Sequence, residues 1–311
     1  LLFEHGTIAT LVDRLADPLP AVAPTAVTAD GDAESFALSG VQRAFHTLHR
    51  LYPQVAAYGF VRHSVTGPLD ADLLGQALAQ LTRRHPMLRM RWTDDGAAPP
   101  RQLIGPPTPA ADWYAVHDYG QGDGDGDVDT LTERLCNEPI DLTRRPPLRA
   151  ALIRTGPDAA QLLLVLHHAA GDGASLSVLS EELWQVYGAL AAGRVPQLPA
   201  VPATFRDHLA VAAPARAEDL AFWRETLASW PTGLRLPWRD PAAPPAPPYA
   251  AHQVAVDPPT VAALTRAAAA AQVSLFHLLL AGYARCLARA SGQRTVTVSV
   301  ARAGRDARLP G

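Results

Sequence analysis

The apolar run from Leu162 to Leu166 constrains the fold of this chain more than any other feature. A strand with one wet face alternates apolar and polar residues, whereas this run is continuous and therefore predicts a strand buried on both faces. Such a strand needs layers of other elements on each side. Two histidines, His167 and His168, end the run. Because successive side chains of a strand point to opposite faces, we expect one histidine to lie inward and the other to face solvent.

Periodicity elsewhere predicts helices interleaved with strands. Asp70 is placed to cap a helix whose leucines recur at helical spacing until His85, where Pro86 follows. Two stretches rich in Gly, Pro or Asp, 96–110 and 120–129, predict loops. Helices are expected at 36–53, 70–85, 130–137, 175–190, 219–230, 258–271 and 274–290, and strands at 57–67, 87–92, 148–155, 160–168 and 294–300. This alternation predicts a layered α/β fold.

Composition and charge argue against several classes of function. The net charge is −3 and the arginines are scattered, which argues against nucleic-acid binding. No apolar run approaches the roughly 18 residues of a membrane span. Cys136 and Cys286 are far apart and lack the spacing of metal ligands, so neither a disulfide framework nor a metal site is predicted. We therefore expect a cytoplasmic protein that has no metal site and binds neither membrane nor nucleic acid.

The segment from His167 to Gly173 reads H-H-x-x-x-D-G, which resembles the signature of nonribosomal peptide synthetase condensation domains and their chloramphenicol-acetyltransferase-like relatives. Other segments match in the family's order, and the resemblance runs from about Phe36 to the last residue. Ala174 departs from the pattern, because the family often carries Trp there. The matching segments are 38–45 (LSGVQRAF), 83–92 (RRHPMLRMRW), 139–153 (PIDLTRRPPLRAALI), 205–210 (FRDHLA) and 301–305 (ARAGR).

The resemblance implies a two-lobed chloramphenicol-acetyltransferase-like α/β fold with its site in the cleft between the lobes. We expect the N-terminal lobe at 36–200 and the start of the C-terminal lobe at 201–311. This second lobe is expected to be incomplete, because the sequence stops before the family's later Asn-containing motif. Residues 1–16 resemble the last helix of an acyl carrier protein, and their sequence is more similar to polyketide carriers than to peptidyl carriers. Residues 17–35 are expected to form a Pro/Ala-rich linker. A hybrid polyketide–peptide assembly line is the expected setting.

The resemblance also assigns roles to the histidines and the aspartate. It implies that His168 is the catalytic residue, either as a base for the acceptor amine or by positioning the nucleophile or hydrogen-bonding the tetrahedral intermediate. His167 is expected to be structural. Asp172 is expected to be semi-buried, where a carboxylate without a partner is costly. The resemblance implies that this partner is Arg305.

Four further residues have expected roles at or near this segment. Gly173 allows either a sharp turn or a close approach of the backbone to substrate. Ser175 either contacts an oxyanion or the substrate, or caps the following helix. Arg84 and Arg89 are expected to anchor ion pairs in the N-terminal lobe.

The implied activity is transfer of a donor acyl group from a carrier-bound thioester to the amine or hydroxyl of an acceptor on a downstream carrier. No cofactor is expected to bind directly, since substrates would arrive on phosphopantetheine arms. The expected partners are an upstream donor carrier, a downstream acceptor carrier and neighbouring synthase domains. Three alternatives stay open, namely an epimerisation domain, a related carrier-dependent acyltransferase and a catalytically silent carrier-docking scaffold.

Overall fold

A computed structural model describes most of the chain from Ser35 to Ala301. The carrier-like helix predicted at 1–16, the linker expected at 17–35 up to residue 34, and Arg305 lie outside the described residues. At 124–127 only the backbone is described. The described residues are 35–93, 99–119, 124–211, 216–228, 230, 233–237 and 254–301.

A mixed four-stranded sheet forms the centre of the N-terminal part, in the order β2-β7-β6-β5. Strands β2 and β7 pair antiparallel along their whole length, from Tyr58 opposite His167 to Thr66 opposite Ala159. Strands β7 and β6 are also antiparallel, whereas β6 and β5 are parallel. The strands are β2 (Tyr58–Thr66), β5 (Tyr114–Asp118), β6 (Leu148–Gly156) and β7 (Ala159–His167). The prediction of strands at β2, β6 and β7 is confirmed, while β5 was not predicted.

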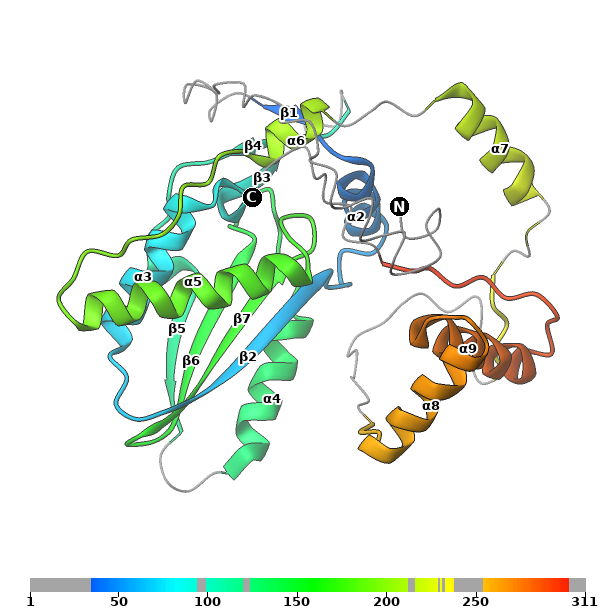
Figure 1. Cartoon of the computed structure of the whole chain (residues 1–311). Helices are drawn as coiled ribbons and strands as arrows, with labels where there is room; N and C mark the ends of the chain where they lie inside the picture. The colour runs from blue at the N-terminus through cyan, green and yellow to red at the C-terminus, as the bar shows by residue number, and fades with distance from the viewer. Residues whose placement is uncertain are drawn as a thin grey trace, which may run out of the picture.

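Helices cover both faces of this sheet (Figure 1). On one face, Leu162, Leu164 and Leu166 of β7 pack into a cluster with side chains of α3 (Ala71–Arg84) and α5 (Gly173–Ala191). On the other face, Leu163 and Val165 pack against side chains of α4 (Gly124–Asn137). All five residues of the run are buried, so the expected strand with two dry faces is confirmed.

A second, three-stranded sheet lies beside the end of β7, in the order β1-β4-β3. Side chains of this sheet, such as Trp92, form a separate apolar cluster with Leu142 and Ala169 from outside the sheet. The neighbouring elements are β1 (Phe36–Ala37), α2 (Gly40–Leu51), the 3-10 turn η2 (Pro86–Arg89), β3 (Met90–Thr93), β4 (Arg101–Ile104) and the 3-10 turn η3 (Ala110–Asp112). Strand β4 lies within a stretch predicted as a loop, and the helix predicted from residue 36 begins at Gly40.

Local signals explain the helix boundaries in one case and fail in another. The Asp70 carboxylate accepts hydrogen bonds from the Asp72 and Leu73 N–H groups, so the predicted cap of α3 is confirmed. By contrast, α4 begins at Gly124, inside the predicted 120–129 loop. Its apolar side chains, including Val128, are buried against β7. Packing against the sheet therefore extends this helix through Gly and Asp residues that favour turns.

From Phe205 onward, the helices are the only regular secondary structure among the described residues. These are α6 (Phe205–Val211), α7 (Ala217–Ala228), α8 (Pro258–Ala270) and α9 (Leu275–Ser291). The strand predicted at 294–300 is not formed, because no described strand of this part offers it a partner for hydrogen bonding. Of the described residues in 205–301, Ala268 alone is buried, and large apolar side chains such as Trp223, Phe276 and Leu279 are exposed.

No single helix in the described part of the chain is long and apolar enough to cross a membrane. Helices α8 and α9, bent by 98° at their break, satisfy the length and composition criteria as a pair.

Replacing Leu162 by Ala should lower the free energy of unfolding by about 2–5 kcal/mol, because the fully buried side chain leaves a cavity between the sheet and its helices. The matched control Leu279→Ala removes the same atoms from an exposed position of α9 and should change it by about 0.5 kcal/mol or less. Urea unfolding of the chain, followed by the fluorescence of its tryptophans, measures both. Equal losses in the two variants would contradict the placement of the core.

Candidate functional site

The histidine pair stands where β7 ends, and its backbone is fixed there by neighbouring segments. The His167 N–H donates to the Pro147 carbonyl at 2.9 Å, and the His168 N–H donates to the Ala57 carbonyl at 3.0 Å. His167 is thus the last residue of β7, and His168 begins the turn that follows it. His167 is buried and His168 is exposed, so the expected division into one inward and one outward histidine is confirmed.

The His167 ring is enclosed by aromatic side chains. Its Nδ1 accepts a hydrogen bond from the Ala169 N–H at 3.0 Å, so the neutral ring carries its proton on Nε2. Phe45 and Trp92 both meet it edge to face, with centroids 6.2 and 5.5 Å away. Burial, assisted by the nearby His49 and His168, lowers the pKa of His167 to about 3. This histidine is therefore neutral at physiological pH and holds the turn that follows it.

The His168 ring presents one nitrogen to the protein. Its Nδ1 lies 3.4 Å from the Gly171 carbonyl oxygen, and the ring stacks on Phe45 with centroids 5.7 Å apart and an angle of 15° between the planes. A carbonyl oxygen only accepts hydrogen bonds, so this contact requires the proton on Nδ1. In that neutral tautomer Nε2 carries a lone pair and can accept a proton or a hydrogen bond.

Asp172 caps helix α5. Its Oδ1 accepts hydrogen bonds from the Ser175 N–H at 2.8 Å and from the Ser175 hydroxyl at 2.7 Å, while the Asp172 N–H donates to Ser175 Oγ at 3.2 Å. Helix α5 therefore begins at Gly173, and the expectation that Ser175 is the N-cap is wrong. The N-cap is Asp172, because its carboxylate accepts the Ser175 amide of the first turn, which has no partner within the helix. The hydroxyl proton of Ser175 is used within this cap.

The glycine that packing requires in this turn is Gly171 rather than Gly173. A Cβ at residue 171 would lie 2.6 Å from Leu166 Cδ2 and 3.0 Å from Ser175 Cβ, so the buried Leu166 side chain would have to move to admit it. A Cβ at Gly173 would meet nothing within 4 Å, and the φ of Gly173 is not in the left-handed region. A sharp turn therefore does not explain the glycine at position 173. The open space beside Gly173 agrees with the other expected role, a close approach of the backbone to substrate.

A buried amide pair ties the turn after the histidines to the second sheet. The Gln42 side chain donates to the Ala169 carbonyl at 2.9 Å, and Gln42 and Gln102 exchange hydrogen bonds of 2.8 Å. Ser39 and Gln42 also form a capping box at the start of α2. The segment 38–45 thus acts on the site through Gln42. Gln102 was missed because it lies in β4, which the sequence did not predict.

Helix α5 is fixed to α3 by an ion pair. Arg84 Nε and Nη2 both lie about 3.0 Å from the Glu182 carboxylate, and His85 Nε2 lies 2.6 Å from it. Burial alone raises the pKa of Glu182, but the hydrogen bonds and charge of Arg84 and His85 outweigh it and hold this pKa below its ordinary value. Arg84 is therefore the predicted ion-pair anchor. Among the contacts described, Arg89 donates to the carbonyls of Thr82 and Gly105.

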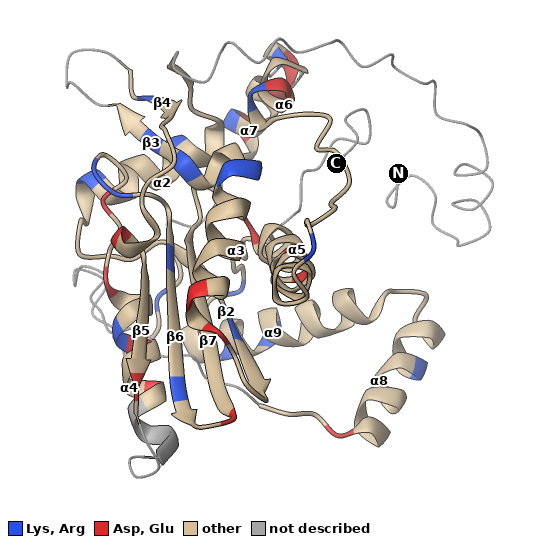
Figure 2. Cartoon of the chain, turned by 90° about the vertical axis from the view of Figure 1, so that its left-hand side faces the viewer, with Lys and Arg blue, Asp and Glu red and all other residues tan. Residues whose placement is uncertain are grey.

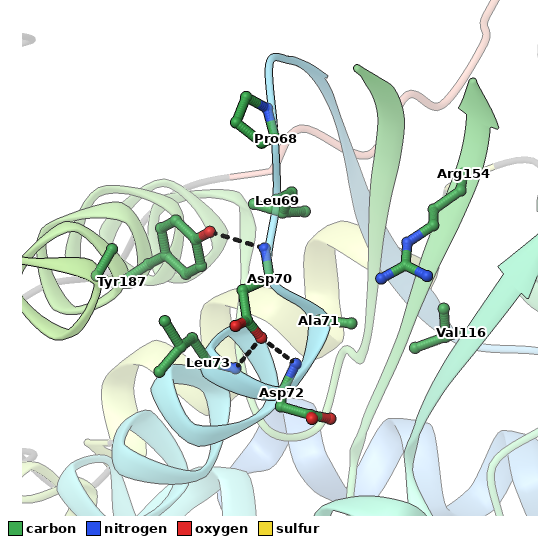
Figure 3. A pocket seen from close by; sticks show the side chains of 10 residues that line it. Pro68, Leu69, Asp70, Ala71, Asp72, Leu73, Val116, Arg154 and Tyr187 are labelled. Atoms are coloured by element: carbon green, nitrogen blue, oxygen red, sulfur yellow. Dashed lines mark hydrogen bonds between the residues drawn. The ribbon is translucent and has the colours of Figure 1, made fainter. Parts of the chain in front are cut away.

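Two surface cavities lie away from the histidines. The larger, about 630 Å³, is lined among others by Asp70, Arg154 and Tyr187, and Figure 3 shows Tyr187 bonded to the Asp70 amide. Arg154 pairs with Ala160 at the start of β7, at the opposite end of the sheet from His168. The smaller, about 440 Å³, lies beside Arg84. Neither cavity includes the histidines, so the candidate site is the turn that contains them. Charged residues are spread over the elements around the sheet (Figure 2).

Known proteins match the chain over most of its length. A family model described as "Condensation domain" matches residues 32–310. A linear gramicidin synthase of Brevibacillus parabrevis is 29% identical over 98% of this chain and 4% of the relative. The dimodular nonribosomal peptide synthase of Bacillus subtilis (strain 168) is 28% identical over 98% of this chain and 13% of the relative. The chain thus spans a small part of each of these relatives.

Among solved structures, the first condensation domain of the calcium-dependent antibiotic synthetase, in complex with a substrate analogue, is 25% identical with a TM-score of 0.72. The similarity covers 89% of this chain and 67% of that domain. The predicted mixed α/β fold is therefore confirmed as that of this group of proteins.

The Asp172 carboxylate has two candidate partners, the α5 amides and Arg305, and two substitutions separate them. Asp172→Asn keeps a capping oxygen and should leave the free energy of unfolding nearly unchanged, whereas Asp172→Ala should lower it by about 0.5–2 kcal/mol. Chemical unfolding of both variants measures this difference. If Asp172→Asn and Asp172→Ala lose the same free energy of unfolding, and adding Arg305→Met to either variant causes no further loss, the charge pair with Arg305 outweighs the cap.

Acid should weaken the α3–α5 contact through Glu182. Because the folded-state pKa of Glu182 is lowered, its contribution to stability is fully present above its unfolded pKa of about 4.3 and is lost as the pH falls through the folded value. Glu182→Gln should therefore lose about 1.5–3 kcal/mol at pH 7 and little at pH 3. Unfolding measured at both pH values tests this. The neighbouring exposed Glu181→Gln is the control, and a similar loss there would contradict the assignment.

Proposed function

The chain belongs to the condensation-domain family of nonribosomal peptide synthetases, and from that premise we propose that it transfers a donor acyl group from a carrier-bound thioester to an acceptor amine. Condensation domains of this kind are acyltransferases that form amide bonds. The observation that carries the proposal for this chain is the exposed His168, whose Nδ1 faces the Gly171 carbonyl and whose Nε2 is left for a ligand.

The proposed step forms a C–N bond and breaks a C–S bond. The acceptor amine attacks the thioester carbonyl carbon, the carbonyl oxygen becomes an oxyanion, and the thiolate leaves when the carbonyl reforms. The amine nitrogen loses one proton, which the leaving sulfur finally takes. A histidine ring placed beside the amine can accept that proton as a general base. Because Nε2 of His168 is an acceptor in the tautomer described, it suits the attacking amine better than the oxyanion.

The remaining site residues support His168 in this proposal. His167 holds the turn as a neutral ring, and Asp172 with Ser175 starts α5 beside it. Since the Ser175 hydroxyl donates to Asp172, we assign Ser175 to the helix start rather than to the oxyanion. Arg305 is proposed as the additional partner of Asp172, and Gly173 as a place where the substrate passes close to the backbone.

We propose that donor and acceptor arrive on phosphopantetheine arms of two carrier domains, with no cofactor bound by this chain itself. The two lobes are proposed to divide near residue 200, with the reaction in the cleft between them. The sequence of residues 1–16, which resembles a polyketide carrier, supports a hybrid polyketide–peptide assembly line as the parent enzyme. The matched relatives are nonribosomal peptide synthetases.

The test uses the parent synthetase with donor and acceptor carriers loaded, and follows acyl transfer by intact-protein mass. His168→Ala should lower the transfer rate about 100-fold or more if the ring accepts the proton. His168→Gln can still form a hydrogen bond but cannot take a proton. If Gln restores most of the rate, the ring positions the amine, and if Gln and Ala are equally slow, it acts as a base. Transfer by His168→Ala at the wild-type rate would refute the role of this residue.

The same assay separates condensation from epimerisation. A donor amino acid deuterated at its α-carbon keeps its label through acyl transfer, because that carbon is not deprotonated. An epimerisation domain would exchange the label with solvent and lower the mass of the loaded carrier by one unit without transfer. Loss of label without an acceptor product would therefore overturn the proposal.

A further inference from the structure

We propose that Phe45 and Gly59 are positioning residues for His168. Phe45 stacks on one face of the imidazole, and Gly59 provides the space that the edge of the ring occupies. The proposal deepens the function given above and rests on it for its catalytic consequence. The two residues come from different elements, α2 and β2, and both are distant in sequence from His168.

The hydrogen bond of His168 does not fix its ring by itself. The side chain is exposed at the end of β7, and its Nδ1 contact with the Gly171 carbonyl is long, at 3.4 Å. Hydrogen bonds between nitrogen and oxygen cluster near 2.9–3.0 Å and weaken with distance. An exposed side chain with one weak contact samples several rotamers unless its neighbours restrict it. The orientation of Nε2 therefore depends on packing.

Phe45 supplies a flat wall on one side of His168. The two rings are 15° from parallel with centroids 5.7 Å apart, within the range of offset-stacked aromatic pairs. Phe45 also meets His167 edge to face, so one ring contacts both histidines. Its own position is secured by Gln42, one turn earlier in α2, which donates to the Ala169 carbonyl. The wall and the histidine turn are thus tied to each other.

Gly59 supplies the space on β2. A Cβ at this position would lie 3.2 Å from His168 Cε1 and 3.2 Å from Leu176 Cδ1, closer than nearly all real contacts of that kind. The φ of Gly59 is not in the left-handed region, so the backbone does not demand glycine. Glycine inside a strand weakens the strand and marks places where another group approaches closely. Here the approaching groups are the ring of His168 and the side chain of Leu176.

A methyl group at residue 59 would push the edge of the imidazole away from β2, and loss of the Phe45 ring would free the face on which it stacks. Both changes move Nε2 relative to any bound acceptor. A misplacement of about 1 Å at a reacting group can cost about 100-fold in rate. We therefore expect Phe45→Leu and Gly59→Ala each to slow acyl transfer about 10- to 100-fold, with little change in the KM for the acceptor carrier.

The geometry is tested without any substrate, by NMR of the full 311-residue chain labelled with ¹³C and ¹⁵N histidine at pH 8. The His168 signals are assigned as those that vanish in His168→Gln. In the wild type the stacked Phe45 ring should shield the His168 Hε1 proton, and the ¹⁵N shifts should report a proton on Nδ1. Phe45→Leu should move Hε1 downfield. Gly59→Ala should displace the ring from Gly171 and raise the population with the proton on Nε2.

Matched controls separate positioning from general damage. Phe60→Leu removes a ring that packs beside Tyr58 rather than on the histidine pair, and Gly188→Ala adds a methyl group where nothing lies within 4 Å. Both should leave the His168 signals and the transfer rate unchanged. Phe45→Tyr keeps the flat ring and should retain the wild-type signals. Its success with failure of Phe45→Leu would show that the ring, not mere bulk, is needed.

The two readouts distinguish failure of this inference from failure of the proposed function. If the His168 signals do not move in folded Phe45→Leu and Gly59→Ala, the positioning roles are refuted, whatever the transfer rates are. If the signals move as expected while transfer proceeds at the wild-type rate, the positioning roles stand and the catalytic role of His168 fails. If signals move and transfer slows together, both proposals are supported.

Discussion

The burial of β7 between β2 and β6 is the constraint on which the rest of the structure depends. Five consecutive apolar residues exclude water from both faces of this strand, so α3 and α5 must cover one face and α4 the other. Because the middle of the strand is enclosed in this way, His167 and His168 lie at its end. There the backbone N–H groups of His167 and His168 donate to the Pro147 and Ala57 carbonyls, which fixes the backbone where the strand passes into the turn.

How much of this fold the sequence predicts depends on how far each element is stabilised by its own residues. Strand β7 and helices α3 and α5 carry long patterns and clear boundaries, and all three were predicted. Strands β1, β4 and β5 have two to five residues and no strong alternation, so they exist through pairing with a neighbour. The alternating run at 294–300 is the reverse case, since its pattern is right but no described strand pairs with it.

The candidate site shows the same division. Alternation along a strand was sufficient to predict that one histidine is buried and the other exposed. Three residues contact the site or its supporting residues only across 60 or more residues of sequence, namely Phe45, Gln102 and Glu182. No local sequence pattern predicts contacts of that range. Gly59 did leave a signal, because a glycine inside an otherwise strand-like stretch indicates a close approach. What the sequence did not contain was the identity of the approaching group.

Burial of one ring lets two histidines stand side by side at the end of β7 without repelling each other. Two imidazolium ions side by side would repel each other, and each would lower the pKa of the other. Burial resolves this conflict, because it lowers the pKa of His167 to about 3 and keeps that ring neutral at physiological pH. A neutral His167 still accepts the Ala169 N–H bond that shapes the turn. The ring that shapes the turn therefore keeps one protonation state near neutral pH, and the shape of the turn does not depend on its titration.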